Sequence, residues 1–102
     1  MTEPVVRYSK TTMRYPALII DEGYSFSEAS TRVLKSCLNS AEDGPRLTVY
    51  LSLADGLFDV GLLNFSQLRS ICKLIGTENL YIILQKDTEA IRGEGLFALF
   101  SL

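Results

Sequence analysis

The sequence of 102 residues contains no histidine and no tryptophan. Histidine is the most frequent general base and the commonest neutral metal ligand, so Ser–His–acid triads and histidine-based zinc sites are excluded. Basic residues are not in excess, since ten Lys and Arg stand against twelve Asp and Glu. Because phosphate contacts require a basic surface, the sequence argues against nucleic acid as the main partner.

Cysteine is also scarce, with only Cys37 and Cys72 in the chain. Neither belongs to a Cys-x-x-Cys pair, and without histidine they do not make up a zinc site. Both fall on apolar faces of predicted helices, which favours buried reduced thiols. A catalytic thiol needs a neighbouring base that the sequence does not offer. We therefore expect no catalytic residue, no metal site and no cofactor.

Long hydrophobic runs are missing too. The longest apolar runs have about five residues, whereas a membrane-spanning helix needs about twenty. Residues 1–16 lack the apolar core of a secretion signal. The seven glycines are scattered and form neither of the common phosphate-binding loops. We expect a cytoplasmic protein without a membrane span.

What the chain does contain is typical of one globular domain. Hydrophobic residues make up 47% and charged residues 22% of the sequence. The length fits a single domain over residues 1–102, with residues 1–14 as an arm. No repeat, linker or low-complexity segment divides the chain.

The first half of the chain alternates between strand and helix signals. The apolar run Ala17–Ile20 predicts a buried strand. Ser25 and Glu28 fit a capping box that opens a helix, with apolar positions from Phe26 to Leu38 at helical spacing. Leu47, Val49, Leu51 and Leu53 alternate with polar residues, which predicts a strand with one apolar face.

The second half begins with a predicted loop over residues 57–61. Asn64 and Gln67 then form a second cap-like pair that opens a helix, and Gly76 is placed to end it. Residues 80–84 predict a central strand, and residues 96–100 predict a final strand.

This order predicts an α/β fold with a small mixed, mostly parallel sheet of four to five strands and two main helices. Strand–helix–strand units of this length form right-handed crossovers between parallel strands. The free edge of the terminal strand, residues 96–100, invites pairing with another chain. A homo-oligomer, or a structural subunit of a larger assembly, is therefore one interpretation.

Charged residues at the predicted strand ends suggest a second interpretation. Asp21 and Glu22, Asp55, and Lys86 with Asp87 follow successive strands, and carboxyl ends of parallel strands share one edge. Carboxylates there hold magnesium, and a lysine meets a phosphoryl group, as in phospho-acceptor domains. The alternative is that acids and glycines simply favour the turns that end strands.

A third interpretation comes from a resemblance. A strand, a loop with Tyr24, a capped helix, Asp-Gly-Pro-Arg and an apolar strand resemble the first half of a STAS domain, the module of anti-sigma factor antagonists. In residues 57–63, Asp59 and Gly61 match the family pattern, while Val60 occupies the position of the phosphorylatable serine. The similarity covers residues 15–100. A shorter stretch around residues 80–87 is also similar to part of the ornithine decarboxylase antizyme core.

The STAS resemblance implies a non-catalytic regulatory or adaptor protein. Its partner would be a kinase-like anti-sigma factor, a transporter subunit or a signalling scaffold. The implied partner-binding residues lie in one short stretch: Leu57, Phe58, Asp59, Val60 and Gly61. With Val60 in place of the serine, Ser66 is the nearby candidate for phosphorylation, and a constitutive adaptor is favoured over a phosphorylation switch.

Overall fold

The computed structural model describes residues 13–39, 44–54 and 56–99. Within them, α-helices and strands build an α/β fold around one mixed five-stranded sheet. The elements are β1 (Ala17–Ile20), α1 (Glu28–Asn39), β2 (Arg46–Leu53), β3 (Gly56–Asn64), α2 (Leu68–Ile75), β4 (Leu80–Ile83), β5 (Ile91–Arg92) and α3 (Gly95–Leu99). Short 3-10 turns precede α2 and β4.

The strand order in the sheet is β3-β2-β1-β4-β5. Only β1 and β2 are parallel, and the other three neighbouring pairs are antiparallel. The prediction of a mostly parallel sheet is therefore wrong. The physical reason is the short connection from β2 to β3, which allows a hairpin but no crossover.

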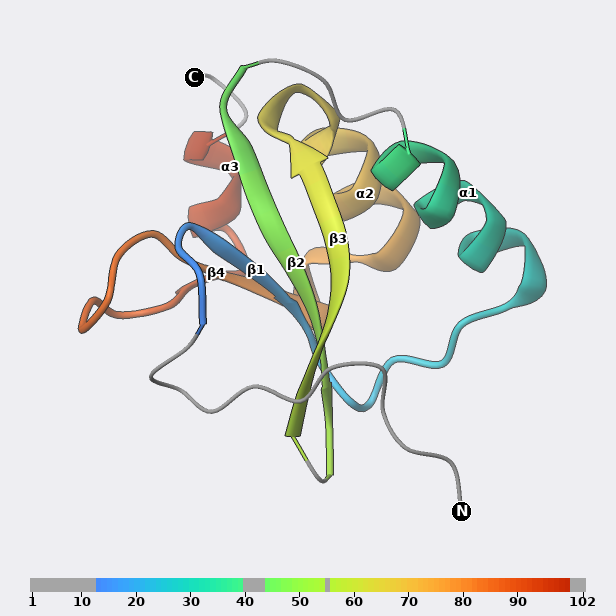
Figure 1. Ribbon diagram of the computed structural model, residues 1–102, viewed down its shortest axis with the longest axis horizontal. Helices are drawn as coiled ribbons and strands as arrows, with labels where there is room; N and C mark the ends of the chain where they lie inside the picture. Colours follow the sequence, from blue (N-terminus) through green and yellow to red (C-terminus); the bar gives the residue numbers. More distant parts are fainter. Residues whose placement is uncertain (1–12, 40–43, 55, 100–102) are drawn as a thin grey trace.

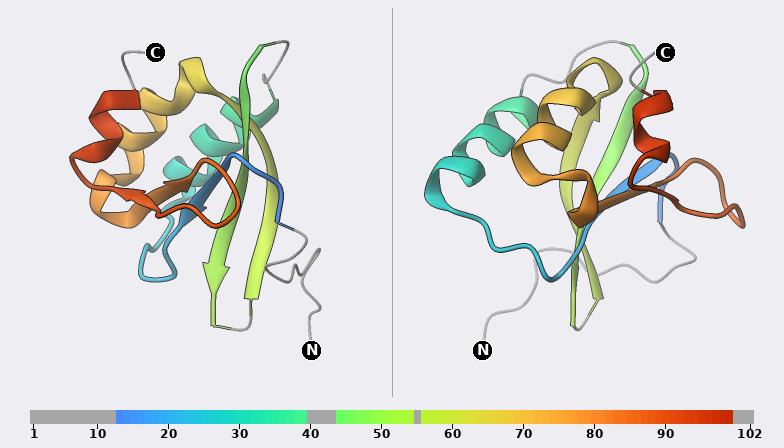
Figure 2. Two further views of the ribbon diagram at one scale, coloured as in Figure 1. Left: turned by 90° about the vertical axis from the view of Figure 1, so that its left-hand side faces the viewer. Right: turned by 180° about the vertical axis from the view of Figure 1, so that it is seen from behind.

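The three helices cover one face of the sheet (Figures 1 and 2). The main core lies under them and gathers buried aliphatic side chains from every layer, including Leu18, Val49, Ile71 and Leu96. The opposite face of the sheet carries a smaller buried cluster of Ala17, Ile19 and Tyr50. Both faces of β1 are therefore buried, as expected for a central strand with a continuous apolar sequence.

The N-terminus of α1 is capped by Ser27, two residues after the predicted cap at Ser25. The Ser27 hydroxyl accepts a hydrogen bond of 3.0 Å from the Ser30 amide, and the Ser27 amide donates to the Ser30 hydroxyl at 2.9 Å. Ser30 thus fills the role that glutamate usually has in a capping box. The predicted pairing of Ser25 with Glu28 is wrong, because α1 begins only at Glu28.

Replacing Ser27 by alanine is expected to lower the free energy of unfolding by about 1 kcal/mol, because the first turn of α1 loses its acceptor. Ser25→Ala is the matched control and should change it by less than about 0.5 kcal/mol, because Ser25 is exposed. Urea titration of both variants measures the difference. Equal losses would contradict the observed cap.

The predicted loop over residues 57–61 is instead part of β3, where these residues pair with β2. Gly56, with φ of 142°, allows the tight turn that starts the strand. The register shifts between Val49 and Tyr50, so that Val60 is the extra residue of a β-bulge. This bulge interrupts the alternation that identifies a strand, and Asp59 and Gly61 add polar and flexible residues to it.

The C-terminal prediction is also wrong. Gly95–Leu99 forms the helix α3, which buries Leu96 in the main core, while β5 pairs with β4. The expected free edge over residues 96–100 is therefore not an edge, and residue 100 lies outside the described residues. In the described chain, the outer strands are β3 and β5.

The second helix is close to its prediction. Asn64 and Gln67 form a capping box around the 3-10 turn Phe65–Gln67, and α2 follows directly. Gly76 ends α2 with φ of 96°, in the region that favours glycine.

Residues 1–12 of the expected arm lie outside the described residues. At its end, the Arg14 amide donates a 2.9 Å hydrogen bond to the Tyr50 hydroxyl.

Candidate functional site

The predicted partner-binding residues divide between the two faces of the sheet. All of them, Leu57, Phe58, Asp59, Val60 and Gly61, are half-buried in β3. Leu57 packs against the cluster on the opposite face, whereas Val60 packs against the core under the helices. The bulge at Val60 thus brings one part of the predicted site next to α1.

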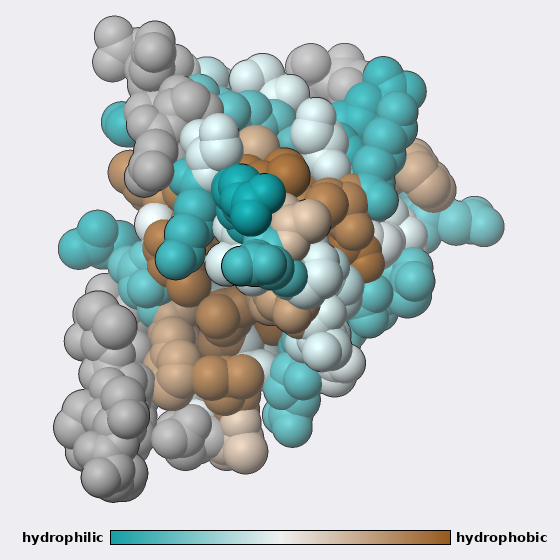
Figure 3. Space-filling model, turned by 90° about the vertical axis from the view of Figure 1, so that its right-hand side faces the viewer, coloured by the Kyte–Doolittle hydropathy of each residue, from teal (hydrophilic) through white to brown (hydrophobic). Residues whose placement is uncertain are grey.

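Val60 and Asp59 line a cavity of about 490 Å³ between α1, β2 and β3, which we call the α1–β3 groove. Most of its lining is aliphatic or aromatic. The lining residues are Phe26, Thr31, Leu34, Lys35, Leu38, Leu51, Asp59 and Val60. Figure 3 shows this side of the molecule, where apolar surface lies next to hydrophilic side chains.

Local contacts hold the walls of the groove. The ring of Phe26 packs edge-on against Tyr24, with 4.7 Å between the ring centroids. The Thr31 hydroxyl donates to the Ser27 carbonyl at 2.9 Å, which turns its polar group toward the helix backbone. On the opposite wall, the Asp59 carboxylate accepts a 2.9 Å hydrogen bond from the Gly61 amide. These contacts define a preformed apolar hollow with a cation, Lys35, and a carboxylate at its rim.

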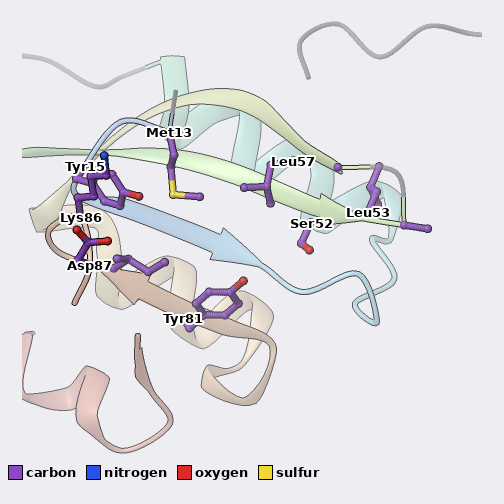
Figure 4. A pocket seen from close by; sticks show the side chains of 11 residues that line it. Met13, Tyr15, Ser52, Leu53, Leu57, Tyr81, Lys86 and Asp87 are labelled. Atoms are coloured by element: carbon purple, nitrogen blue, oxygen red, sulfur yellow. The ribbon is translucent and has the colours of Figure 1, made fainter. Parts of the chain in front are cut away.

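A second cavity, of about 530 Å³, lies on the opposite face of the sheet (Figure 4). Met13, Leu57 and Tyr81 project into it, and Tyr15, Lys86 and Asp87 lie at one end. The Arg92 guanidinium lies 4.0 Å from the centre of the Tyr81 ring, a cation–π contact. Burial raises the pKa of Tyr81 despite this neighbouring charge. Tyr81 is therefore neutral at physiological pH.

Asp21 and Glu22 do not meet Lys86 and Asp87 at one end of the sheet, as the sequence predicts. Asp21 and Glu22 follow β1, whereas Lys86 and Asp87 follow β4, which runs antiparallel to β1. The ends of antiparallel neighbours lie at opposite edges, so this prediction is wrong for these residues. Asp55 lies outside the described residues. Among the residues that the structure describes, no three His, Cys, Asp or Glu are grouped as metal ligands.

The two thiols differ in their surroundings. Cys72 is buried in the main core, and this burial raises its pKa to about 11. Cys37 is only half-buried, so the prediction of two buried thiols is correct for Cys72 alone. Neither cysteine forms a disulfide. At neutral pH Cys72 is protonated, and it fills space in the core as a small apolar residue.

Ser66, the candidate for phosphorylation, is exposed in the 3-10 turn before α2.

Sequence reasoning missed the α1 side of the groove. Thr31, Lys35 and Leu38 share one face of α1 because they are spaced at helical intervals. An apolar stripe with a lysine at its border is visible in the sequence. The strand that packs against this stripe is not visible there, because the sequence of residues 57–61 predicts a loop rather than an outer strand beside the helix.

In the described part of the chain, no helix has both the length and the apolar character needed to cross a membrane. Comparisons with protein-family models, with curated proteins and with solved structures find no match for this chain. The local geometry of the groove is therefore the basis for a functional proposal.

Proposed function

We propose that this chain is a non-catalytic regulatory or adaptor protein that binds another protein through the α1–β3 groove. The observation that carries the proposal is the groove itself, an apolar hollow of about 490 Å³ open to the surface. Apolar surface bordered by charged residues is typical of protein interaction sites.

The lining favours binding over chemistry. Its charged groups, Lys35 and Asp59, stand at the rim of an otherwise mainly apolar hollow. The Asp59 carboxylate accepts the Gly61 amide and thereby fixes the bulge of β3. An apolar groove selects a partner by the shape of the side chains that it buries. The charged residues then orient the bound partner.

The resemblance to STAS domains supports the same class of function. In the STAS resemblance, Val60 takes the place of the phosphorylatable serine. This protein would therefore act as a constitutive adaptor in the cytoplasm. Its partner would be a kinase-like anti-sigma factor, a transporter subunit or a signalling scaffold. Because Val60 lines the groove, one residue connects the STAS resemblance with the proposed binding surface.

Val60→Asp tests the proposal. The change places a charge in the apolar lining beside Asp59, and burying it against a partner is unfavourable. We expect partner binding to weaken by about tenfold or more. The partner is first captured from native lysate with the wild-type protein and purified, and its direct affinity for each variant is then measured by calorimetry.

Two further variants make the result specific. Val33→Asp introduces the same charge on α1 at a side chain that is 44% exposed and outside the groove lining, and it should leave binding unchanged. Val60→Thr keeps a similar shape but adds a hydroxyl without a charge, and it should weaken binding less than Val60→Asp. If folded Val60 variants bind as the wild type does, the groove is not the partner-binding surface.

A further inference from the structure

The outer edge of β3 has no strand beside it in the described part of the chain. β3 has nine residues and hydrogen-bonds to β2 on its inner side only. The other outer strand, β5, has two residues. An outer strand of this length presents a row of backbone donors and acceptors, and an extended chain pairs with such a row. Of the two outer strands, β3 is therefore the one long enough to accept another strand.

The α1–β3 groove lies between α1 and the helix-covered side of β2 and β3. In Figure 1, α1 lies to the right of β3 and behind the sheet, so the helix reaches past the outer strand. Val60 and Asp59 contribute to the groove from β3, and Leu34, Lys35 and Leu38 contribute from α1. A chain added to β3 would point alternate side chains to the helix-covered side of the sheet. The groove is thus placed to receive one of those side chains.

We propose that β3 binds an extended segment of a partner protein as an additional strand. One apolar side chain of that segment enters the α1–β3 groove, and an acidic side chain lies against Lys35. This inference rests on the proposed function and adds the chemistry of the partner. Strand addition combines backbone hydrogen bonds, which give affinity, with side-chain pockets, which give specificity.

The charges on the helix side of the groove favour an acidic segment, whereas Asp59, on the opposite wall, accepts the Gly61 amide. Lys35 is exposed and lines the groove, and it also lines an adjoining hollow together with the exposed Arg32. Glu28 is the acidic member of that hollow, so the outer side of α1 there carries two cations and one carboxylate. A carboxylate on the bound segment complements this surface and favours its association.

The same features argue against a second copy of this chain as the occupant. Asp59 lies next to the centre of β3, so antiparallel pairing of two β3 strands about their centres places the two Asp59 side chains diagonally across the strand pair. Like charges in neighbouring positions across paired strands are destabilising.

The test uses a random library of nine-residue peptides, the length of β3. Peptides selected on the full chain should carry apolar residues at every second position and at least one Asp or Glu. In nuclear magnetic resonance spectra of the labelled protein, a selected peptide should shift the backbone amides of β3. The same amides should exchange more slowly with deuterium.

Lys35→Glu should weaken binding of the selected peptide by about three- to tenfold, because an attractive rim charge becomes repulsive. Lys73→Glu on α2 is the matched control, since Lys73 is exposed and outside the groove, and it should have little effect. Calorimetry measures both.

Several outcomes overturn the inference. Selected peptides with helical spacing, or shifts confined to α1, would show that the groove takes a helix. A library that yields no binder, or a mass in solution that doubles with concentration, would also overturn it. If partner binding nevertheless depends on Val60, the proposed function stands and only the strand-addition inference fails. If Val60 has no influence, the proposed function itself fails.

Discussion

Replacing Ile71 by alanine is expected to lower the free energy of unfolding by about 2–5 kcal/mol. Ile71 is fully buried on α2, in the core that α2 shares with the sheet. Truncation removes apolar contacts and leaves a cavity that the surrounding side chains fill only in part. Since a domain of this size has a total stability of about 5–15 kcal/mol, the loss is a large part of it. Urea-induced unfolding, followed by circular dichroism, measures it.

Two further alanine variants serve as references for the loss at Ile71. Leu34→Ala should also be destabilising but nearer the lower limit, because Leu34 borders the α1–β3 groove and remains 5% exposed. Val33→Ala, at a side chain that is 44% exposed, should cost less than about 0.5 kcal/mol. A loss below about 0.5 kcal/mol for both Ile71 and Leu34 would contradict the assigned core faces of α1 and α2.

Local signals predicted those elements whose burial follows a regular period. The apolar run Ala17–Ile20 is a strand, and the stripe ending at Gly76 is a helix, because each pattern repeats with the period of its structure. The predicted buried face of α1 is only partly correct. Leu34 is buried, but Ala29 and Val33 are exposed, and the polar Ser30 takes a buried position because it belongs to the cap.

Local sequence patterns did not predict which strands pair or in which direction they run. The bulge at Val60 breaks the alternation of β3, so the stretch resembles a loop in the sequence. The apolar residues of α3 fit a short strand as well as a single turn of helix, and tertiary packing of Leu96 decides between them. The direction of β4 relative to β1 depends on contacts between distant segments, which no local pattern contains.

For the candidate site, sequence reasoning named two of the residues that line the groove on β3, Asp59 and Val60, and none of those on α1. Asp59 and Val60 are predicted contact residues, and the structure places both in the lining of the groove. Their neighbours Thr31, Lys35 and Leu38 are distant in sequence and come together only because β3 runs beside α1. The predicted meeting of Asp21 and Glu22 with Lys86 and Asp87 is wrong for the same reason, because these residues were placed by an assumed direction of β4.

Raising the pH from 9 to 11 is expected to destabilise the protein through Cys72. Burial raises the pKa of this thiol from 9.0 to about 11. The folded protein therefore keeps the thiol proton over a pH range in which the unfolded chain loses it. Because the unfolded state then binds fewer protons, the free energy of unfolding falls with rising pH. The contribution is fully present below about pH 9 and is lost as pH rises to about 11.

The expected loss from this thiol is about 2–3 kcal/mol, because a tenfold difference in proton affinity between the folded and unfolded states corresponds to about 1.4 kcal/mol. Burial also raises the pKa values of Tyr50 and Tyr81, so these side chains destabilise the fold in the same direction at higher pH. Cys72→Ala isolates the thiol, because it keeps both tyrosines. Urea titrations of the wild type and of Cys72→Ala at several pH values, with reducing agent present, measure the difference.

Cys37→Ala provides the matched control, because Cys37 is half-buried whereas Cys72 lies in the core. Cys72→Ala should lower stability at neutral pH by removing core volume, yet lose less of its remaining stability between pH 9 and 11. If Cys72→Ala and the wild type lose equal free energy over that range, the thiol of Cys72 is accessible to water and the packing of α2 against the sheet is looser than described.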